Sequence, residues 1–283
     1  MCPPTRKQQL QRRTLMKRLF MALLLLLMTT TTAKADLTFG VIPLEDKEVM
    51  IQKFTALAQY LGSQLGETVT LKIGNDYNEI ESGLSAGNIQ IAYVGPSGAV
   101  KVNQENPAVF PLVKVVKGGS PFYKSYIIAK KDSPLNSPAD LKGKVFAFGD
   151  KGSTSSYLVP KYILATNGVS LDDLKDSKLT GSHSNVLKAV LDGSADAGGL
   201  KESLAVKNED KVKFLEISKP IPNFPICANV KALGKEKAKK IQAVLVAMPE
   251  KAKEITAISK KYDKFDKASI ADYQIIAAIM KKQ

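Results

Sequence analysis

The sequence has few of the residues on which redox, zinc or histidine chemistry depends. Among its 283 residues are two cysteines, one histidine and no tryptophan. Zinc sites and CxxC redox motifs need more ligands than this, so both are excluded. Arginine is scarce as well, because all four arginines lie within the first 18 residues. Arginine forks provide many of the contacts that proteins make to bases and phosphates, so this distribution argues against nucleic-acid binding.

Several catalytic and nucleotide-binding motifs are also missing. The sequence contains no GxGxxG, no GxxxxGK[ST] and no HExxH pattern. The only histidine is His183, so acid/base chemistry near neutral pH would have to use it. With 44% hydrophobic and 24% charged residues, the composition is that of an ordinary globular protein with a core. We expect no metal and no cofactor.

The first 35 residues have the pattern of a secretory signal peptide. The basic pair Lys17-Arg18 is followed by the apolar run Leu19–Met28 and then by Ala33-Lys34-Ala35. A run of this length is about half of the 20 residues that a membrane-spanning helix needs, and A-x-A is a cleavage pattern. We therefore expect cleavage after Ala35 and a periplasmic protein. Translation could start at Met1 or at Met16.

Export changes how the high charge is interpreted. The formal net charge is +14, but seven positive groups and no acidic residue lie in residues 1–35. The rest of the chain carries 34 lysines against 27 acidic residues, and its lysines are spread over most of its length. This distribution is typical of a solvated surface, and we expect no nucleic-acid partner.

Strand and helix patterns alternate along residues 36–283. The β-rich segment Leu37–Ile42 ends at Pro43, and apolar residues then recur with helical spacing from Glu48 to Leu65. We expect Gly66 to be the C-cap of this helix. This alternation predicts an α/β fold with mixed, mostly parallel sheets flanked by helices.

Two clusters of Gly, Ser and Pro interrupt the alternation, near Gly118–Ser125 and Ile217–Pro222. We interpret them as crossings between two lobes. Residues 36–120 plus 220–283 would form a discontinuous lobe one, and residues 121–219 would form lobe two.

One segment has the composition of an anion-binding turn. In Phe148–Tyr157 a strand ends, two glycines allow a tight turn, and four hydroxyl residues open a helix. The first turn of a helix has free N–H groups and a partial positive charge, which attract anions. The hydroxyls of Ser153, Thr154 and Ser155 would add donors. Alternatively, Ser153 or Ser155 merely caps the helix.

A second turn of this kind, Thr180–Asn185, places His183 at the start of another helix. His183 could donate to an anion there or serve as a structural donor. Tyr77 and Tyr93 lie near strand ends, where α/β folds bind ligands, although either could be a core residue.

Together these segments resemble the phosphonate/phosphite-binding proteins of ABC importers, a branch of the two-lobed, transferrin-like (type II) periplasmic binding proteins. The resemblance extends from about Leu37 to Pro225. It rests on Leu37–Pro43, Asp76-Tyr77, Ile91–Pro96, Lys131–Pro134, Asp140–Val145, Phe148–Pro160, Thr180–His183 and Gly193–Ala197.

The resemblance implies a monomeric receptor that closes two lobes on a small phosphorus oxyanion and delivers it to an ABC permease. Phosphite, methylphosphonate and phosphate are the expected ligands. It further implies roles for the six candidate residues. Ser153, Thr154 and Ser155 would hold the ligand oxygens and His183 would donate from the opposite edge. Tyr77 would reach the ligand from lobe one, and Tyr93 would line the same cleft.

The chain departs from the family pattern where carriers of amino-substituted phosphonates place a carboxylate. Ile221–Pro225 resembles an Ile-Pro-x-Asp-Pro stretch, but Phe224 stands in place of the acid. A second acid would fall near Lys201-Glu202, so the role of Glu202 is open. An enzyme on the same fold, with His183 as the acid/base, is the alternative to a receptor.

The signal-peptide pattern gives the first testable prediction. We expect N-terminal sequencing of the exported protein to begin at Asp36, and a start at Met1 or Met16 would contradict it. Cleavage would remove Cys2 and leave Cys227 without a partner. A reducing agent should therefore leave the melting temperature unchanged.

Overall fold

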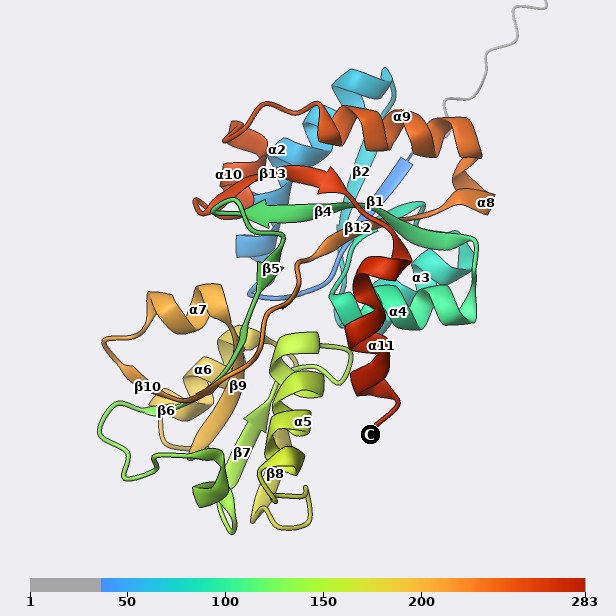
Figure 1. Ribbon diagram of the computed structural model, residues 1–283. Coiled ribbons are helices and arrows are strands. Elements are labelled where there is room, and N and C mark those ends of the chain that lie inside the picture. Colours follow the sequence, from blue (N-terminus) through green and yellow to red (C-terminus); the bar gives the residue numbers. More distant parts are fainter. Residues whose placement is uncertain (1–36, 283) are drawn as a thin grey trace, which may run out of the picture. The chain divides into compact units, whose positions relative to one another are not determined.

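The structure, a computed structural model, describes residues 37–282 (Figure 1). The predicted signal peptide lies outside this range. The larger sheet has six strands in the order β13-β4-β12-β3-β1-β2. These strands are β1 (Leu37–Val41), β2 (Val69–Ile73), β3 (Ile91–Tyr93), β4 (Val109–Lys117), β12 (Pro225–Asn229) and β13 (Tyr262–Lys267).

The second sheet has five strands in the order β10-β6-β9-β7-β8. They are β6 (Ser125–Lys130), β7 (Val145–Phe148), β8 (Asp176–Leu179), β9 (Ala197–Lys201) and β10 (Val212–Ile217). Each sheet thus draws all its strands from one of the two segments that we interpreted as lobes. Between the sheets runs a short antiparallel pair, β5 (Phe122–Tyr123) with β11 (Ile221–Pro222), at the two expected crossings.

The expected two-lobed α/β fold is confirmed, although its sheets are more mixed than the sequence pattern indicated. Strand β1 pairs in parallel with β2 and β3, and β7 pairs in parallel with β8 and β9. The remaining pairs in both sheets are antiparallel. The reason is the crossings: β4 leaves lobe one and β12 returns to it, so the two run in opposite directions side by side.

Helices flank both sheets. They are α2 (Lys47–Leu65), α3 (Tyr77–Ala86), α4 (Pro96–Glu105), α5 (Val159–Thr166), α6 (His183–Leu191), α7 (Glu202–Lys207), α8 (Val230–Leu233), α9 (Lys235–Val246), α10 (Lys253–Ile258) and α11 (Gln274–Met280), with the short turns η1 (Pro138–Leu141), η2 (Thr154–Leu158) and η3 (Ile270–Tyr273). Within residues 37–282, no helix is both long enough and apolar enough to cross a membrane.

Helix α2 illustrates how the sequence pattern becomes packing. Its apolar residues, at helical spacing, are buried on one face, and the helix ends at Gly66, whose φ of 70° is left-handed, as expected of a C-capping glycine. Phe54 on that face contacts Phe39 edge to face at 6.1 Å and Tyr93 at 4.9 Å between ring centroids. This helix therefore connects the core of lobe one to the end of β3, where the candidate site begins. Cys227 is free and buried in β12.

Candidate functional site

The hydroxyl-rich turn follows β7, as expected, but its hydroxyls have different roles. The Ser153 side chain caps the turn η2: its Oγ accepts the N–H of Ser156 at 3.2 Å and the Ser156 hydroxyl at 2.8 Å. Both hydroxyls are buried. The capping interpretation, which we had weighed as the alternative, therefore describes Ser153, and Ser156 supports it.

Thr154 bonds across to the other lobe. Its Oγ1 accepts the N–H of Ser97 at 2.9 Å and lies 2.8 Å from the Ser97 Oγ. The Ser97 hydroxyl hydrogen goes to the Gly152 carbonyl at 2.7 Å. Thr154 is then the donor of the hydroxyl pair. Its hydroxyl group thus holds the first turn of α4 in lobe one against the hydroxyl-rich turn of lobe two.

The hydroxyl of Ser155 is different, because its Oγ is buried and has no hydrogen-bond partner among the described residues. The carbonyl of Ser155 is anchored by the Ser125 hydroxyl at 2.7 Å. The Tyr123 hydroxyl is likewise buried and unpartnered within residues 37–282. Burial raises the pKa of Tyr123, and the nearby hydroxyls of Ser155 and Thr154 only partly oppose this. Ser155 and Tyr123 therefore offer two neutral donors side by side.

His183 begins α6, after Ser182, whose side chain accepts the N–H of Asn185. The imidazole is fully buried, and its Nδ1 accepts the N–H of Lys201 at 3.2 Å. Nδ1 is thus an acceptor, which puts the proton of the neutral ring on Nε2. No described residue pairs with Nε2. Burial, followed by the ammonium of Lys201, holds the pKa of His183 well below 6.5, with Glu45 opposing. His183 is therefore a neutral donor.

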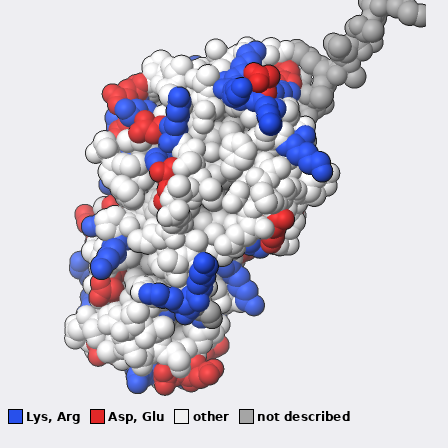
Figure 2. Space-filling model, turned by 45° about the vertical axis from the view of Figure 1, so that its right-hand side comes forward, with Lys and Arg blue, Asp and Glu red and all other residues white. Residues whose placement is uncertain are grey.

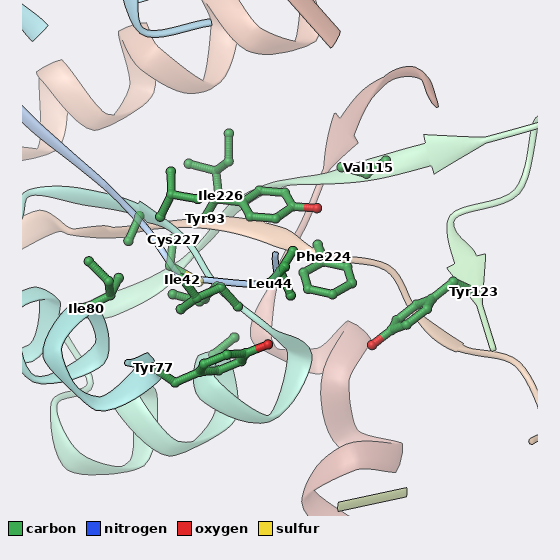
Figure 3. Packing of buried hydrophobic residues seen from close by; sticks show 14 of the residues in the cluster. Ile42, Leu44, Tyr77, Ile80, Tyr93, Val115, Tyr123, Phe224, Ile226 and Cys227 are labelled. Atoms are coloured by element: carbon green, nitrogen blue, oxygen red, sulfur yellow. The ribbon is translucent and has the colours of Figure 1, made fainter. Parts of the chain in front are cut away.

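Tyr77 reaches the same region from lobe one. It lies at the start of α3, where Asp76 caps the helix, and it is buried. Burial raises the pKa of its hydroxyl, with Ser153 opposing. Figure 3 shows the hydroxyls of Tyr77 and Tyr123 pointing toward each other, with Phe224 and Leu44 beside them. The region where these two hydroxyls face each other is the candidate site.

Tyr93 does not bring its hydroxyl to this region. That hydroxyl lies 3.4 Å from the Tyr262 hydroxyl, and the ring stacks on Phe224 with centroids 5.2 Å apart and planes 5° apart. Tyr93 thus packs behind Phe224, whose ring lies beside the candidate site. Tyr123, and not Tyr93, directs its hydroxyl toward that site. Sequence reasoning missed Tyr123 because β5 belongs to a crossing and not to the end of a core strand.

Ser97 was also missed, although a signal for it exists. It follows β3 in the segment Gly95–Gly98, which has the same pattern of glycine and hydroxyl at a helix start as the two turns we singled out. The strand order explains its position. The end of β3 beside β1 brings the first turn of α4 to the same edge of the sheet as Tyr77.

Two acidic residues of interest, Glu202 and Glu45, are paired with lysines. Glu202 lies 2.8 Å from the Nζ of Lys117, which settles where its carboxylate points. Glu45 contacts Lys201 at 2.8 Å and Lys53 at 2.6 Å. Burial alone would raise the pKa of Glu45, but the two lysines hold it at about 2. Neither carboxylate is therefore free to receive an ammonium group from a ligand.

Other sites are not supported in the described part of the chain. Within it, no group of three or more Cys, His, Asp or Glu residues could hold a metal ion. On the face seen in Figure 2, lysines stand among acidic and uncharged residues without forming a continuous basic stripe. This agrees with a solvated charged surface.

The geometry also bears on the enzyme alternative. His183 is kept neutral, and its pKa is far from the value near 7 that suits a general acid/base. The stretch Gly83–Gly87 has the GxSxG spacing of a nucleophile elbow, but its Ser85 lies inside α3. An elbow requires the serine in a sharp turn between strand and helix.

With the geometry described, the relatives can be compared. The family model for "ABC transporter, phosphonate, periplasmic substrate-binding protein" matches residues 39–273. This chain belongs to that family.

Two curated proteins are similar to this family member. The phosphonates-binding periplasmic protein of Escherichia coli (strain K12) is 33% identical over 203 residues, which is 67% of this chain and 60% of the relative. The phosphate-import protein PhnD of Mycolicibacterium smegmatis is 32% identical over 172 residues, 57% of this chain and 54% of the relative. The chain thus spans little more than half the length of these relatives.

A solved structure shares the fold. PhnD1 from Prochlorococcus marinus, in complex with methylphosphonate, superposes with a TM-score of 0.79 at 23% identity. The superposition covers 87% of this chain and 97% of PhnD1.

The state of His183 gives a prediction. We expect NMR of this single imidazole to show the Nε2–H tautomer and no titration near pH 6.5. Because the folded state disfavours the charged ring, stability should fall as pH drops below about 6.5, where the unfolded chain takes up the proton. A normal titration with a midpoint at about 6.5 would contradict the buried acceptor geometry.

Proposed function

We propose that this chain is a periplasmic receptor that captures a small phosphorus oxyanion between its lobes and delivers it to the permease of an ABC importer. The observation that carries the proposal is the set of buried donors on Ser155, Tyr123 and His183, none of which has a partner among the described residues. Buried polar groups are nearly always hydrogen-bonded, so such a set indicates a ligand with several acceptor oxygens.

The helix starts add to this preference for an anion. The Ser153 and Ser182 caps begin η2 and α6, and Pro96 begins α4, in both lobes near the donors. The N-terminus of a helix favours negative charge. The relatives fit this preference, since one is a phosphonates-binding periplasmic protein, one is a phosphate-import protein, and PhnD1 is in complex with methylphosphonate.

The wall of the site favours a small ligand without a charged tail. Phe224 is 4% exposed and packs between Tyr93 and Tyr123, with ring centroids at 5.2 and 5.1 Å. Its ring suits a hydrogen or methyl substituent better than an ammonium group, because an unpaired buried ammonium is strongly disfavoured. We therefore expect phosphite, methylphosphonate or phosphate to be the ligand, and a monomeric receptor to carry it.

Ser155 allows a direct test of the donor set. We expect Ser155→Ala to weaken the binding of methylphosphonate and phosphate at least about tenfold, because a hydrogen bond to a charged group contributes roughly 1.5–3 kcal/mol. Since the hydroxyl makes no bond within the described residues, the melting temperature of the ligand-free protein should not change. Calorimetry on both proteins provides the measurement, and equal affinities would reject the site.

Ser156→Ala is the matched control. Its hydroxyl donates to Ser153 and not to the candidate site. This variant should lower the melting temperature and affect affinity less than Ser155→Ala does. The reverse order of affinities would show that the two hydroxyls have been assigned the wrong roles.

The preference among ligands provides a separate test. We expect methylphosphonate, phosphite or phosphate to bind at least about tenfold more tightly than aminoethylphosphonate, a difference of about 1.4 kcal/mol. A thermal-shift screen that includes sulfate, followed by competition calorimetry, measures it. Equal affinity for aminoethylphosphonate and methylphosphonate would mean that a carboxylate faces the tail. No shift with any phosphorus oxyanion, under conditions where a ligand at 100 times its Kd adds about 2.7 kcal/mol, would reject the function.

A further inference from the structure

A buried carboxyl group lies behind the candidate site, at the contact between the lobes. Glu81 is in α3, one helical turn after Tyr77, and is 1% exposed. Its Oε2 lies 3.1 Å from the Nζ of Lys101. Its Oε1 is buried and has no hydrogen-bond partner among the described residues. Neither the oxyanion site nor the core requires a carboxyl group here.

Both lobes cover this oxygen. On the side of lobe one, a Cβ added to Gly98 of α4 would lie only 2.3 Å from Oε1. On the side of lobe two, a Cβ added to Gly152 would lie 3.3 Å from Oε1 and 3.0 Å from the Cβ of Tyr77. The Ser97 hydroxyl holds Gly152 in this position through its bond to the Gly152 carbonyl. Part of the cover over Glu81 is therefore the same turn that carries the donors for the ligand.

The groups around Glu81 do not compensate a buried negative charge. Lys101 is the cation that faces it, and that side chain is 38% exposed. Asp150 in the turn of lobe two and Glu105 in α4 act on it as further negative charges, and the neutral groups Tyr77 and Cys227 lie on the adjacent elements. Burial raises the pKa of Glu81 to about 7, with Lys101 opposing and Asp150 and Glu105 adding to the rise.

We propose that Glu81 takes up a proton when the lobes close, so that closure on the ligand, and with it affinity, depends on pH. When lobe two moves away, Gly152 moves with it and water reaches the carboxyl group. The group then returns toward an ordinary pKa of about 4.3. The inference goes beyond the proposed function, but it rests on closure of the lobes around a ligand.

The direction of the effect follows from linkage. The closed state binds the proton more tightly than the open state, so acid favours closure. Affinity should be highest near pH 5, fall as pH rises toward about 7, and stay level above that. Gln at position 81 resembles the protonated acid and should keep the affinity high throughout.

The experiment measures the Kd of methylphosphonate by calorimetry at pH 5, 6, 7 and 8 for the wild type, Glu81→Gln and Glu105→Gln. The ratio of wild-type to Glu81→Gln Kd values cancels the ionisation of the ligand and of the groups common to both proteins. We expect this ratio to rise at least about tenfold between pH 5 and pH 8, as a pKa difference of more than one unit requires. Glu105→Gln, at an exposed position of α4, removes one of the negative charges that raise the pKa of Glu81, so its fall in affinity should remain and move slightly to lower pH.

A second variant distinguishes titration from a structural role. Lys101→Met removes the cation that opposes the rise in pKa, so the fall in affinity should move to higher pH. If Glu81 has only a structural role, the pH at which affinity falls should be the same in Lys101→Met and in the wild type. Calorimetry in two buffers of different ionisation enthalpy should also show proton uptake on binding at pH 6 in the wild type and less in Glu81→Gln.

The outcomes separate this proposal from the proposed function. If methylphosphonate binds and the ratio of Kd values is the same at every pH, the Glu81 proposal is overturned while the receptor function stands. If no phosphorus oxyanion binds to either protein at any pH, the receptor function fails, and the coupling of Glu81 to affinity fails with it.

Discussion

The hydrogen bonds between Ser97 and Thr154 are the contact on which the site depends. They join the first turn of α4 in lobe one to the hydroxyl-rich turn of lobe two at 2.8 and 2.9 Å. Both side chains are buried, so the bonds are not weakened by exchange with water. These bonds fix the position of the hydroxyl-rich turn. That turn carries Ser155, and its Gly152 lies over Glu81 and next to Tyr77. The hydroxyl contact between the lobes therefore positions the hydroxyl groups of the candidate site.

The second constraint is that the proposed anion would have to be bound without arginine in residues 37–282. Neutral donors meet it: two tyrosines with raised pKa values, a serine hydroxyl, and an imidazole that Lys201 holds in one tautomer. Neutral groups cost less to bury than charged ones before a ligand arrives. Beside His183, the single carboxylate of Glu45 pairs with both Lys53 and Lys201, so this group keeps one positive charge in excess. That excess would add to the preference of the neutral donors for an anion.

Local sequence patterns predicted much of the fold and singled out the turns that make up the candidate site, but not how each hydroxyl in them is used. The period of α2, its end at Gly66 and the hydroxyl-rich turn after β7 follow from short-range rules that depend on neighbours in the chain. The different roles of Ser153, Thr154 and Ser155 within that turn do not follow from such rules. Thr154 bonds to Ser97, 57 residues away, and which hydroxyl stays unpartnered depends on that contact. The position of Tyr93 also depends on residues far away in the chain. Phe224 packs between Tyr93 and Tyr123, so the Tyr93 hydroxyl lies toward Tyr262 and Tyr123 supplies the hydroxyl at the candidate site.

If the lobes close on a ligand as proposed, the contacts that join them would also orient the donors. Lys201 belongs to lobe two and binds lobe one through Glu45, while its N–H holds the Nδ1 of His183. The backbone N–H of His183 donates to the Leu44 carbonyl of lobe one at 3.2 Å. The donor on Nε2 is therefore fully oriented only when residues 44 and 45 of lobe one are in contact with lobe two. Opening would release these contacts together with those of Ser97, so the ligand would lose both the enclosure and the donors that recognise it.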